Sequence, residues 1–356
     1  MRKAYTCSDA LLGLICMMLL CGIGIISNTA EISQDPLYET KMKAYEYMDE
    51  CMAAVCSFKK ELDISMTKED IHKTGMIGQA YSPITTSLGS IEAKRTSANP
   101  DMAALMVELL NKAGVREGDI IGANFSGSFP SLNLAVLSAC KAMDVKCVYI
   151  SSVGSSNYGA NDPELTFPDM ALKLAAKGLI DSPGAAFSIG GSGDTGKEME
   201  QEVISRIAGR IESQGLPQIT ARGYQNNLMI RRKLLERSGK LSCFVNVGGN
   251  VTSLGKGENS IYFGQGLIVD KIIPVTEDSG LIEIYRNQGV PVIHLLNLRK
   301  LTVDYGIAYD PVILPSKGTS ALYIKPSYNC IAAISIFAAA VMGLLLYRKK
   351  QGCRTK

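Results

Sequence analysis

The residues from Gly191 to Lys197 have the spacing of a phosphate-binding loop. The run reads GSGDTGK, which fits the pattern G-x-x-x-x-G-K, and it lies between an expected strand and an expected helix. Such a loop needs a serine or threonine hydroxyl at the next position to bind magnesium, but position 198 is Glu. Thr195 and Glu198 instead have the T-x-x-E spacing of a capping box. We therefore expect a helix start at Thr195 that binds an anion such as a carboxylate and does not hydrolyse a nucleotide.

Ser126 lies between an expected strand and an expected helix, where the nucleophile of a hydrolase would be placed. Together with Asp270 or Asp278 and then His294, it follows the Ser, Asp, His chain order of the α/β-hydrolases. The pattern G-x-S-x-G is absent, because Asn124 and Ser128 stand at the two glycine positions. Ser126 and His294 are therefore the catalytic candidates, although the apolar run around His294 favours a buried core histidine.

A second polar stretch, residues 85–97, reads TTSLGSIEAKRTS and combines hydroxyl groups with one acid and two bases. Polar loops are commonly only solvated, yet Lys94 and Arg95 beside hydroxyl groups are also what a carboxylate-rich ligand needs. Arg231, Arg232 and Lys233 lie on an expected helix and are typical of a solvated face. The chain has two histidines and no cysteine spacing typical of zinc ligands, so we expect neither a metal nor a cofactor.

Segments of strand length alternate with segments of helical periodicity from residue 99 onward. This alternation predicts an α/β fold, a Rossmann-like parallel sheet covered by helices on both faces. Strands are expected over 120–124, 145–151, 185–189, 241–247 and 290–295. Helices are expected over 37–62, 99–114, 131–143, 169–177, 195–213, 224–237 and 277–288, with another helix start near 67. Residues 81–97 have no clear assignment.

Ligands of such sheets bind beyond the carboxyl ends of the strands. The segments expected there are rich in Gly, Ser and Asn, which expose backbone N–H groups and short polar side chains. With the polar stretch at 85–97, they give the following ligand-binding candidates: Thr85, Thr86, Ser90, Glu92, Lys94, Arg95, Asn124, Ser126, Ser128, Ser152, Asn157, Gly191, Ser192, Gly193, Asp194, Thr195, Asn246, Gly248, Gly249 and Asn250.

Two uncharged segments bracket the chain. Residues 10–27 and 328–347 carry no charged side chain, and each is about as long as a helix that crosses a bilayer. The first could also be a signal peptide, but its apolar run is long and no small-x-small cleavage site follows, so an uncleaved anchor is favoured. Basic residues follow the second segment, which predicts that both termini are cytoplasmic and that the centre of the chain lies outside the cell membrane.

Charge and length complete the expected organisation. The 356 residues carry a net charge of +3, and residues 28–327 hold 30 basic and 33 acidic residues, so no nucleic-acid partner is expected. We expect four parts: a cytoplasmic stub and transmembrane helix (1–30), a helical segment (31–80), an extracytoplasmic α/β domain (81–325), and a transmembrane helix with a basic tail (326–356).

Long polar strings of this sequence resemble the poly-gamma-glutamate system protein family. They are ITTSLGSIEAKRTSANPDMAAL (84–105), GDIIGANFSGSFPSLNLAVLSA (118–139) and ISSVGSSNYGANDPELTFPDM (150–170), and GGSGDTGKE (190–198) and NVGGN (246–250) also fit. The resemblance covers essentially the whole chain. It implies a bacterial membrane protein that takes part in making, exporting or processing γ-linked polyglutamate, with the synthase and export subunits and the polymer as partners. It implies no specific catalytic residue.

The resemblance and the residues together favour an accessory subunit of the synthesis and export apparatus that binds the polymer or assembles the apparatus. Because every unit of the polymer carries a carboxylate, we expect it to be bound locally by Lys94, Arg95 and the helix starts near 131 and 195. The alternative is a hydrolase or transferase that acts on γ-glutamyl bonds, with Ser126 or a hydroxyl of residues 85–90 as the nucleophile. A third hypothesis is that this chain is a purely structural partner of the synthase.

Overall fold

The computed structural model describes residues 7–257, 261, 263–270 and 274–352. It divides into two units, each described by itself. One unit, which we call the terminal unit, combines the residues up to Asp35 with those from Ile324 onward, and the globular unit runs from Pro36 to Tyr323.

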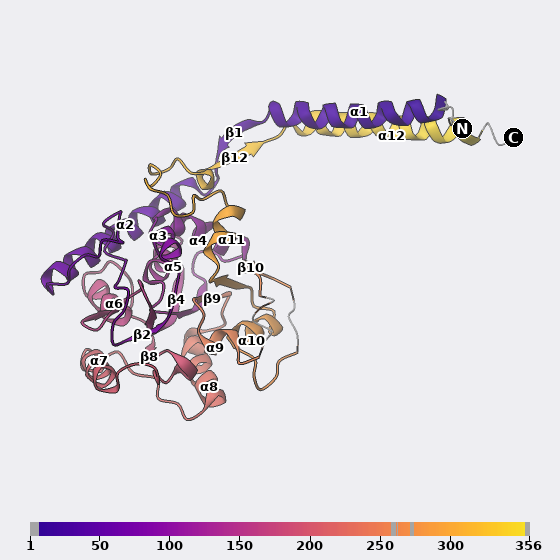
Figure 1. Cartoon of the computed structure of the whole chain (residues 1–356). Helices are drawn as coiled ribbons and strands as arrows, with labels where there is room; N and C mark the ends of the chain where they lie inside the picture. The colour runs from indigo at the N-terminus through magenta and orange to yellow at the C-terminus, as the bar shows by residue number, and fades with distance from the viewer. Residues whose placement is uncertain (1–6, 258–260, 262, 271–273, 353–356) are drawn as a thin grey trace, which may run out of the picture. The chain divides into compact units, whose positions relative to one another are not determined.

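The terminal unit is a helical hairpin closed by a short two-stranded ladder. Helices α1 (Cys7–Asn28) and α12 (Cys330–Gly352) lie side by side (Figure 1), and each is long and apolar enough to cross a membrane. Gly22 faces Ile336 and Gly343 faces Ile15, so the two helices run antiparallel. The strands β1 (Glu31–Gln34) and β12 (Ile324–Ser327) pair antiparallel at the end of the hairpin. Two apolar helices at the chain ends were predicted, and the structure contains both.

The globular unit is built on a six-stranded sheet with the order β10-β11-β9-β3-β4-β8. Its strands are β3 (Ile120–Phe125), β4 (Lys146–Ser152), β8 (Ala186–Ser188), β9 (Cys243–Val247), β10 (Gly266–Ile268) and β11 (Val292–Leu295). The neighbouring strands from β11 through β9, β3 and β4 to β8 all pair in parallel. Strand β10, at the edge of the sheet, pairs antiparallel with β11. The predicted parallel sheet is confirmed. The antiparallel edge strand was not predicted.

Helices cover both faces of this sheet, and the alternation of side chains along the strands decides which helices meet which face. On one face Ile121 and Phe125 join the core formed with α2 (Tyr38–Glu61), α4 (Asp101–Lys112), α5 (Pro130–Ala142) and α6 (Phe167–Ala176). On the other face Phe244 and Val292 pack with α8 (Tyr224–Leu235) and α10 (Leu281–Asn287). Asn124 lies on this second face, because it alternates with Ile121, Ala123 and Phe125.

Shorter elements complete the globular unit. Strand β2 (Thr85–Ser87) pairs with β5 (Ser155–Ser156), and β6 (Asn161–Asp162) pairs with β7 (Leu165–Thr166). The remaining helices are α3 (Ile91–Ser97), α7 (Gln201–Ser213), α9 (Val251–Leu254) and α11 (Leu298–Asp304), with 3₁₀ turns η1 (Ser192–Asp194), η2 (Glu236–Ser238) and η4 (Ala321–Tyr323).

The predicted helix start at Thr195 is wrong, and so is the capping box. Helix α7 begins at Gln201, and Thr195 ends the short turn η1. The backbone from Gly190 to Gly196 has positive φ at five positions, including Asp194 (φ 63°), and a right-handed helix does not accommodate such angles. The Glu198 carboxylate instead accepts a hydrogen bond from the Ser192 N–H.

Three other segments also differ from the prediction. No helix begins near residue 67; the Asp70 carboxylate there closes a turn by accepting the N–H groups of Thr74 and Gly75. The helix predicted from residue 277 begins at Leu281, after Gly280. The unassigned stretch 81–97 contains β2 and α3, and the Ser90 side chain caps α3 by accepting the Ala93 N–H.

Candidate functional site

A pocket of about 290 Å³ lies at the carboxyl ends of strands β3, β4, β8 and β9. The loops that follow these strands form its walls together with β2 and one residue of α8. Many of the predicted ligand-binding residues line it: Thr86, Asn124, Ser126, Ser128, Ser152, Gly191, Ser192, Gly193, Asp194, Gly249 and Asn250. The other lining residues were not among the predicted ligand-binding candidates; they are Ser87, Phe125, Gly154, Ser188, Gly190, Glu198, Arg231, Val251 and Thr252.

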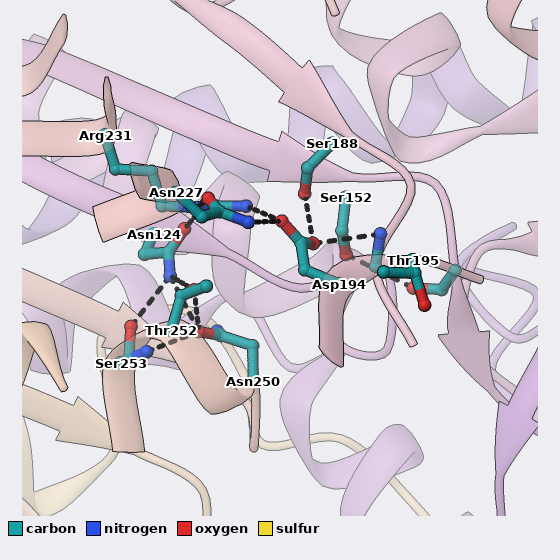
Figure 2. A network of polar contacts seen from close by, with 12 residues as sticks. Asn124, Ser152, Ser188, Asp194, Thr195, Asn227, Arg231, Asn250, Thr252 and Ser253 are labelled. Carbon is teal, nitrogen blue, oxygen red and sulfur yellow. Dashed lines mark hydrogen bonds and ion pairs between the residues drawn. The ribbon is translucent and has the colours of Figure 1, made fainter. Parts of the chain in front are cut away.

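An ion pair between Asp194 and Arg231 lies at the centre of this pocket's wall (Figure 2). The Arg231 Nη2 and Asp194 Oδ2 atoms are 2.7 Å apart, and the two side chains are only 2% and 8% exposed. Asp194 Oδ2 also accepts from Asn227 Nδ2, whereas Oδ1 accepts from the Ser188 hydroxyl and the Gly190 N–H. Each carboxylate oxygen therefore has two donors, which is what a buried charge requires to be stable.

Arg231 links this carboxylate to the neighbouring strand. Its Nε donates to Asn227 Oδ1, one helical turn earlier in α8, and its Nη1 donates to Asn124 Oδ1 at 2.6 Å. The prediction that Arg231 belongs to a solvated face is therefore wrong, although Lys233 on the same helix is exposed. The sequence carried one signal for this arrangement, the four-residue spacing of Asn227 and Arg231 on the expected helix. That spacing indicates a partner for Arg231 but does not indicate that the arginine is buried.

A chain of amide side chains continues from Asn124 along the sheet. Asn124 Nδ2 donates to Asn250 Oδ1 and to the hydroxyls of Thr252 and Ser253. Asn250 Nδ2 then donates to Asn246 Oδ1 at 3.1 Å. Because Asn124, Asn246 and His294 are in register on adjacent strands, their side chains share one face of the sheet. The amides fix the orientation of the loop after β9 relative to β3.

His294 ends this chain and lies in the core. It is 1% exposed, its Nδ1 is 3.0 Å from Asn246 Nδ2, and burial lowers its pKa to about 4. The imidazole is therefore neutral at physiological pH. Ser126 Oγ, the other catalytic candidate, accepts the Ser128 N–H. Within the described residues, no hydrogen bond joins His294 to Ser126, Asp270 or Asp278.

The serine-rich loops after β3 and β4 are locked to each other. The Gly127 N–H donates to Ser152 Oγ, and a Cβ at Gly127 would lie only 2.9 Å from the Gly154 carbonyl oxygen. The Ser156 N–H in turn donates to Ser128 Oγ. A side chain larger than hydrogen at position 127 would separate these two loops, so the close approach needs glycine.

The loop after β8 already accommodates a glutamate carboxylate. Glu198 Oε1 accepts the Ser192 N–H at 2.7 Å, and the carboxylate lies over Gly191, where a Cβ would come within 2.6 Å of Oε1. Glu198 is exposed and lines the pocket. The backbone N–H that we expected to bind a ligand carboxylate thus binds a carboxylate of the chain itself.

The two bases of the stretch 85–97 have partners within the protein. Arg95 donates to both carboxylate oxygens of Asp310, at 2.7 and 2.6 Å, and this contact lowers the pKa of Asp310. Lys94 is 2% exposed and lies over the Phe129 ring, with Nζ 3.7 Å from the ring centroid. Neither base lines the pocket, and the same holds for the other predicted residues Thr85, Ser90, Glu92, Asn157, Thr195, Asn246 and Gly248.

No protein-family model, no curated protein and no solved structure matches this chain. Within the part of the chain that the structure describes, no group of three or more His, Cys, Asp or Glu side chains is placed to bind a metal ion.

Proposed function

We propose that this chain is a membrane-anchored accessory component of the apparatus that makes and exports γ-linked polyglutamate, and that its strand-end pocket binds a γ-glutamyl unit. The resemblance of the long polar strings to the poly-gamma-glutamate system proteins supports the choice of polymer. The two apolar helices support the anchor. In this proposal both termini are cytoplasmic and the globular unit is extracytoplasmic, because basic residues follow the apolar part of α12.

The strand order supports a Rossmann-like arrangement of the sheet. From β3 in the middle the chain proceeds to β4 and β8 on one side and then to β9 and β11 on the other. The direction of progression therefore changes between β3 and β9. In open α/β sheets this change creates a crevice at the carboxyl ends of the strands, and ligands bind there. Asn124 and Asn250 line the pocket at this point.

The observation that carries the proposal is the Glu198 carboxylate bound to the Ser192 N–H in the pocket wall. A glutamyl unit presents the same carboxylate, and its amide groups match the hydroxyls and amides that line the remaining walls. Because Asp194 and Arg231 neutralise each other, recognition depends on hydrogen bonds and backbone N–H groups and not on net charge. A pocket of about 290 Å³ fits one small unit of the polymer and not a long segment.

Calorimetric titration of the full-length chain in detergent micelles with γ-linked triglutamate tests this proposal. We expect saturable binding, weaker binding of α-linked triglutamate, and a loss of about five- to tenfold in affinity on Thr86→Val, which removes one hydroxyl of the pocket and keeps the shape of the side chain. Ser205→Ala on the exposed face of α7 is the matched control.

Equal affinity for the α- and γ-linked peptides, or no binding at all, contradicts the proposal. Incubation with long γ-linked chains, followed by size-exclusion chromatography, separates the remaining readings. Chains that co-elute unchanged with the protein support the binding role, whereas shortened chains support the hydrolase or transferase alternative.

A further inference from the structure

Lys94 is a buried lysine for which the structure provides no carboxylate. No ion pair among the described residues includes it, and its Nζ donates only to the Ser128 carbonyl oxygen and to Ser156 Oγ. Another buried lysine of this unit, Lys41, has Glu108 at 2.8 Å. An ammonium group without a counter-charge is costly to bury, and such lysines commonly lose their proton.

Ser156 is the hydroxyl next to this amine. Its Oγ lies 2.8 Å from Lys94 Nζ, within the distance that a proton transfer requires. The main chain of Ser156 is fixed from two sides, since its N–H donates to Ser128 Oγ and strand β5 pairs with β2. Among the described residues, the one other hydrogen bond of its hydroxyl is donated to the Asn157 carbonyl oxygen, at 3.4 Å. The hydroxyl and the amine are thus each other's closest polar side-chain partners.

A thin segment of main chain separates this pair from solvent. A Cβ placed on Gly89 would lie 3.0 Å from Ser156 Oγ and 3.4 Å from Lys94 Cε, so Gly89 covers both groups directly. Asn157 holds the segment, because its N–H donates to the Ser87 carbonyl oxygen and its Oδ1 accepts the Gly89 N–H. Leu88 between them is 91% exposed, and Ser87 lines the strand-end pocket. Lys94 and Ser156 are 2% and 4% exposed, so a substrate reaches the pair only when residues 87–90 move outward.

We propose that Ser156 and Lys94 form an acyl-transfer site in which Ser156 is the nucleophile and Lys94 is the general base. Neutral Lys94 Nζ takes the hydroxyl proton as Ser156 Oγ forms a bond to the carbonyl carbon of an amide or ester. The bond from that carbon to the leaving group then breaks, and Lys94 returns the proton to the departing amine or alcohol. Water hydrolyses the resulting ester of Ser156, or a second amine takes the acyl group and regenerates the hydroxyl.

The electrostatics of Lys94 agree with this assignment. Burial lowers the pKa of its ammonium group to about 7, so a large part of the side chain is a neutral amine with a free lone pair near neutral pH. Activity should therefore increase with pH through about 7. Lys59 serves as the comparison for Lys94, because burial lowers its pKa as well. Its Nζ donates to the Ile77 carbonyl oxygen, and among the described residues it has no hydrogen bond to a hydroxyl.

Acylation of the full-length chain in detergent by p-nitrophenyl acetate tests the proposal without requiring recognition of glutamate. We expect a burst of p-nitrophenol and an acetyl group on the peptide that contains Ser156, located by mass spectrometry. Ser156→Ala and Lys94→Met should each lower the burst rate at least tenfold, whereas Lys59→Met and Ser205→Ala should not. The thermal unfolding midpoint of each variant shows whether it folds, and Ser156→Cys, with its thiol nucleophile, should retain acylation.

Acylation at Ser156 whose rate rises through about pH 7 in the wild type, and loses that dependence in Lys94→Met, supports the dyad. Acylation at another residue, or none at Ser156 up to about pH 9.5 in the folded protein, overturns it. A structural role of Lys94 alone would change stability but leave the pH profile of acylation unchanged. Failure of triglutamate binding does not affect this result, because the inference does not depend on the ligand proposed for the pocket.

Discussion

Two buried bases, Arg231 and Lys94, lie close to the same pocket and are stabilised in opposite ways. Arg231 has a carboxylate at 2.7 Å and two further polar contacts, whereas Lys94 has only a carbonyl oxygen, a hydroxyl and an aromatic ring. The two side chains are equally buried, at 2% exposed. The difference is therefore in their counter-charge and not in their exposure to solvent.

This difference separates a structural cation from a reactive one. The guanidinium group of Arg231 pairs with Asp194 and donates to Asn124, so it fixes the loop after β8 to α8 and β3. The amine of Lys94 can lose its proton, since burial disfavours its charged form and no carboxylate among the described residues lies beside it to compensate. In the wall of the pocket the first arrangement supplies rigidity, and beside the pocket the second supplies a group that can exchange a proton.

The strongest test of the comparison removes the cation of the ion pair. Arg231→Met leaves the Asp194 carboxylate buried without a counter-charge, and we expect a loss of about 3 to 5 kcal/mol in the free energy of unfolding. Chemical denaturation of the full-length protein in detergent, followed by circular dichroism, measures it. The double variant Arg231→Met/Asp194→Asn should recover much of the loss, and Lys233→Met on the exposed face of α8 should have little effect. Equal losses in the single and double variants would contradict the role of the pair.

Lys94 should affect stability in a pH-dependent manner that Arg231 does not share. Its pKa in the native state, about 7, lies below the usual 10.5, so between these values the unfolded chain binds more protons than the native one. The free energy of unfolding of the wild type should therefore rise relative to Lys94→Met by about 3 kcal/mol from pH 6 to pH 9.5. Denaturation curves of both proteins at the two pH values measure this difference. A constant difference would show that Lys94 is charged in the native state.

The smallest expected effect concerns Glu198, the exposed acid in the pocket wall. Because Asp194 and Arg231 compensate each other, the Glu198 carboxylate should repel a glutamyl ligand. Glu198→Gln keeps an acceptor for the Ser192 N–H and should tighten triglutamate binding about two- to fivefold at low salt. Titrations at low and high salt measure the change, with Glu202→Gln as the control. Unchanged affinity at low salt would place the ligand away from the loop after β8.

The periodicity of the sequence predicted most of the sheet and its helices because burial repeats at fixed intervals. The strands at β3, β4, β9 and β11 and the helices α2, α5 and α8 follow the expected ranges within a few residues. The prediction failed from residue 190 to 200, where a glycine-rich loop continues past Thr195 to a helix start at Gln201. The spacing of Thr195 and Glu198 is typical of a helix start. The positive φ angles of the glycines and of Asp194 in this loop are incompatible with a helix, however, and they delay its start.

The sequence predicted many of the residues that line the pocket but not the partners of its charged side chains. Loops at strand ends supply most of the pocket lining, because parallel strands bring their carboxyl ends to one edge of the sheet. The partners of the charged residues depend on contacts between distant segments. Arg95 reaches Asp310, and Arg231 reaches Asn124 and Asp194, across separations in sequence that no local pattern records. For the same reason the proximity of Lys94 to Ser156 could be found only in three dimensions.

The ladder between β1 and β12 has a consequence for how the chain is assembled. Gln34 pairs with Ile324, so closing the ladder joins two points separated by almost the whole chain, and the entropy of such a closure is unfavourable. Within the globular unit, however, the rings of Tyr38 and Tyr323 near its two ends are in contact, with centroids 5.8 Å apart. Folding of the globular unit therefore brings its own ends together and lowers the entropic cost of closing the ladder. The pairing of α1 with α12 gains in the same way, because the folded segment between them turns a closure over most of the chain into a short one.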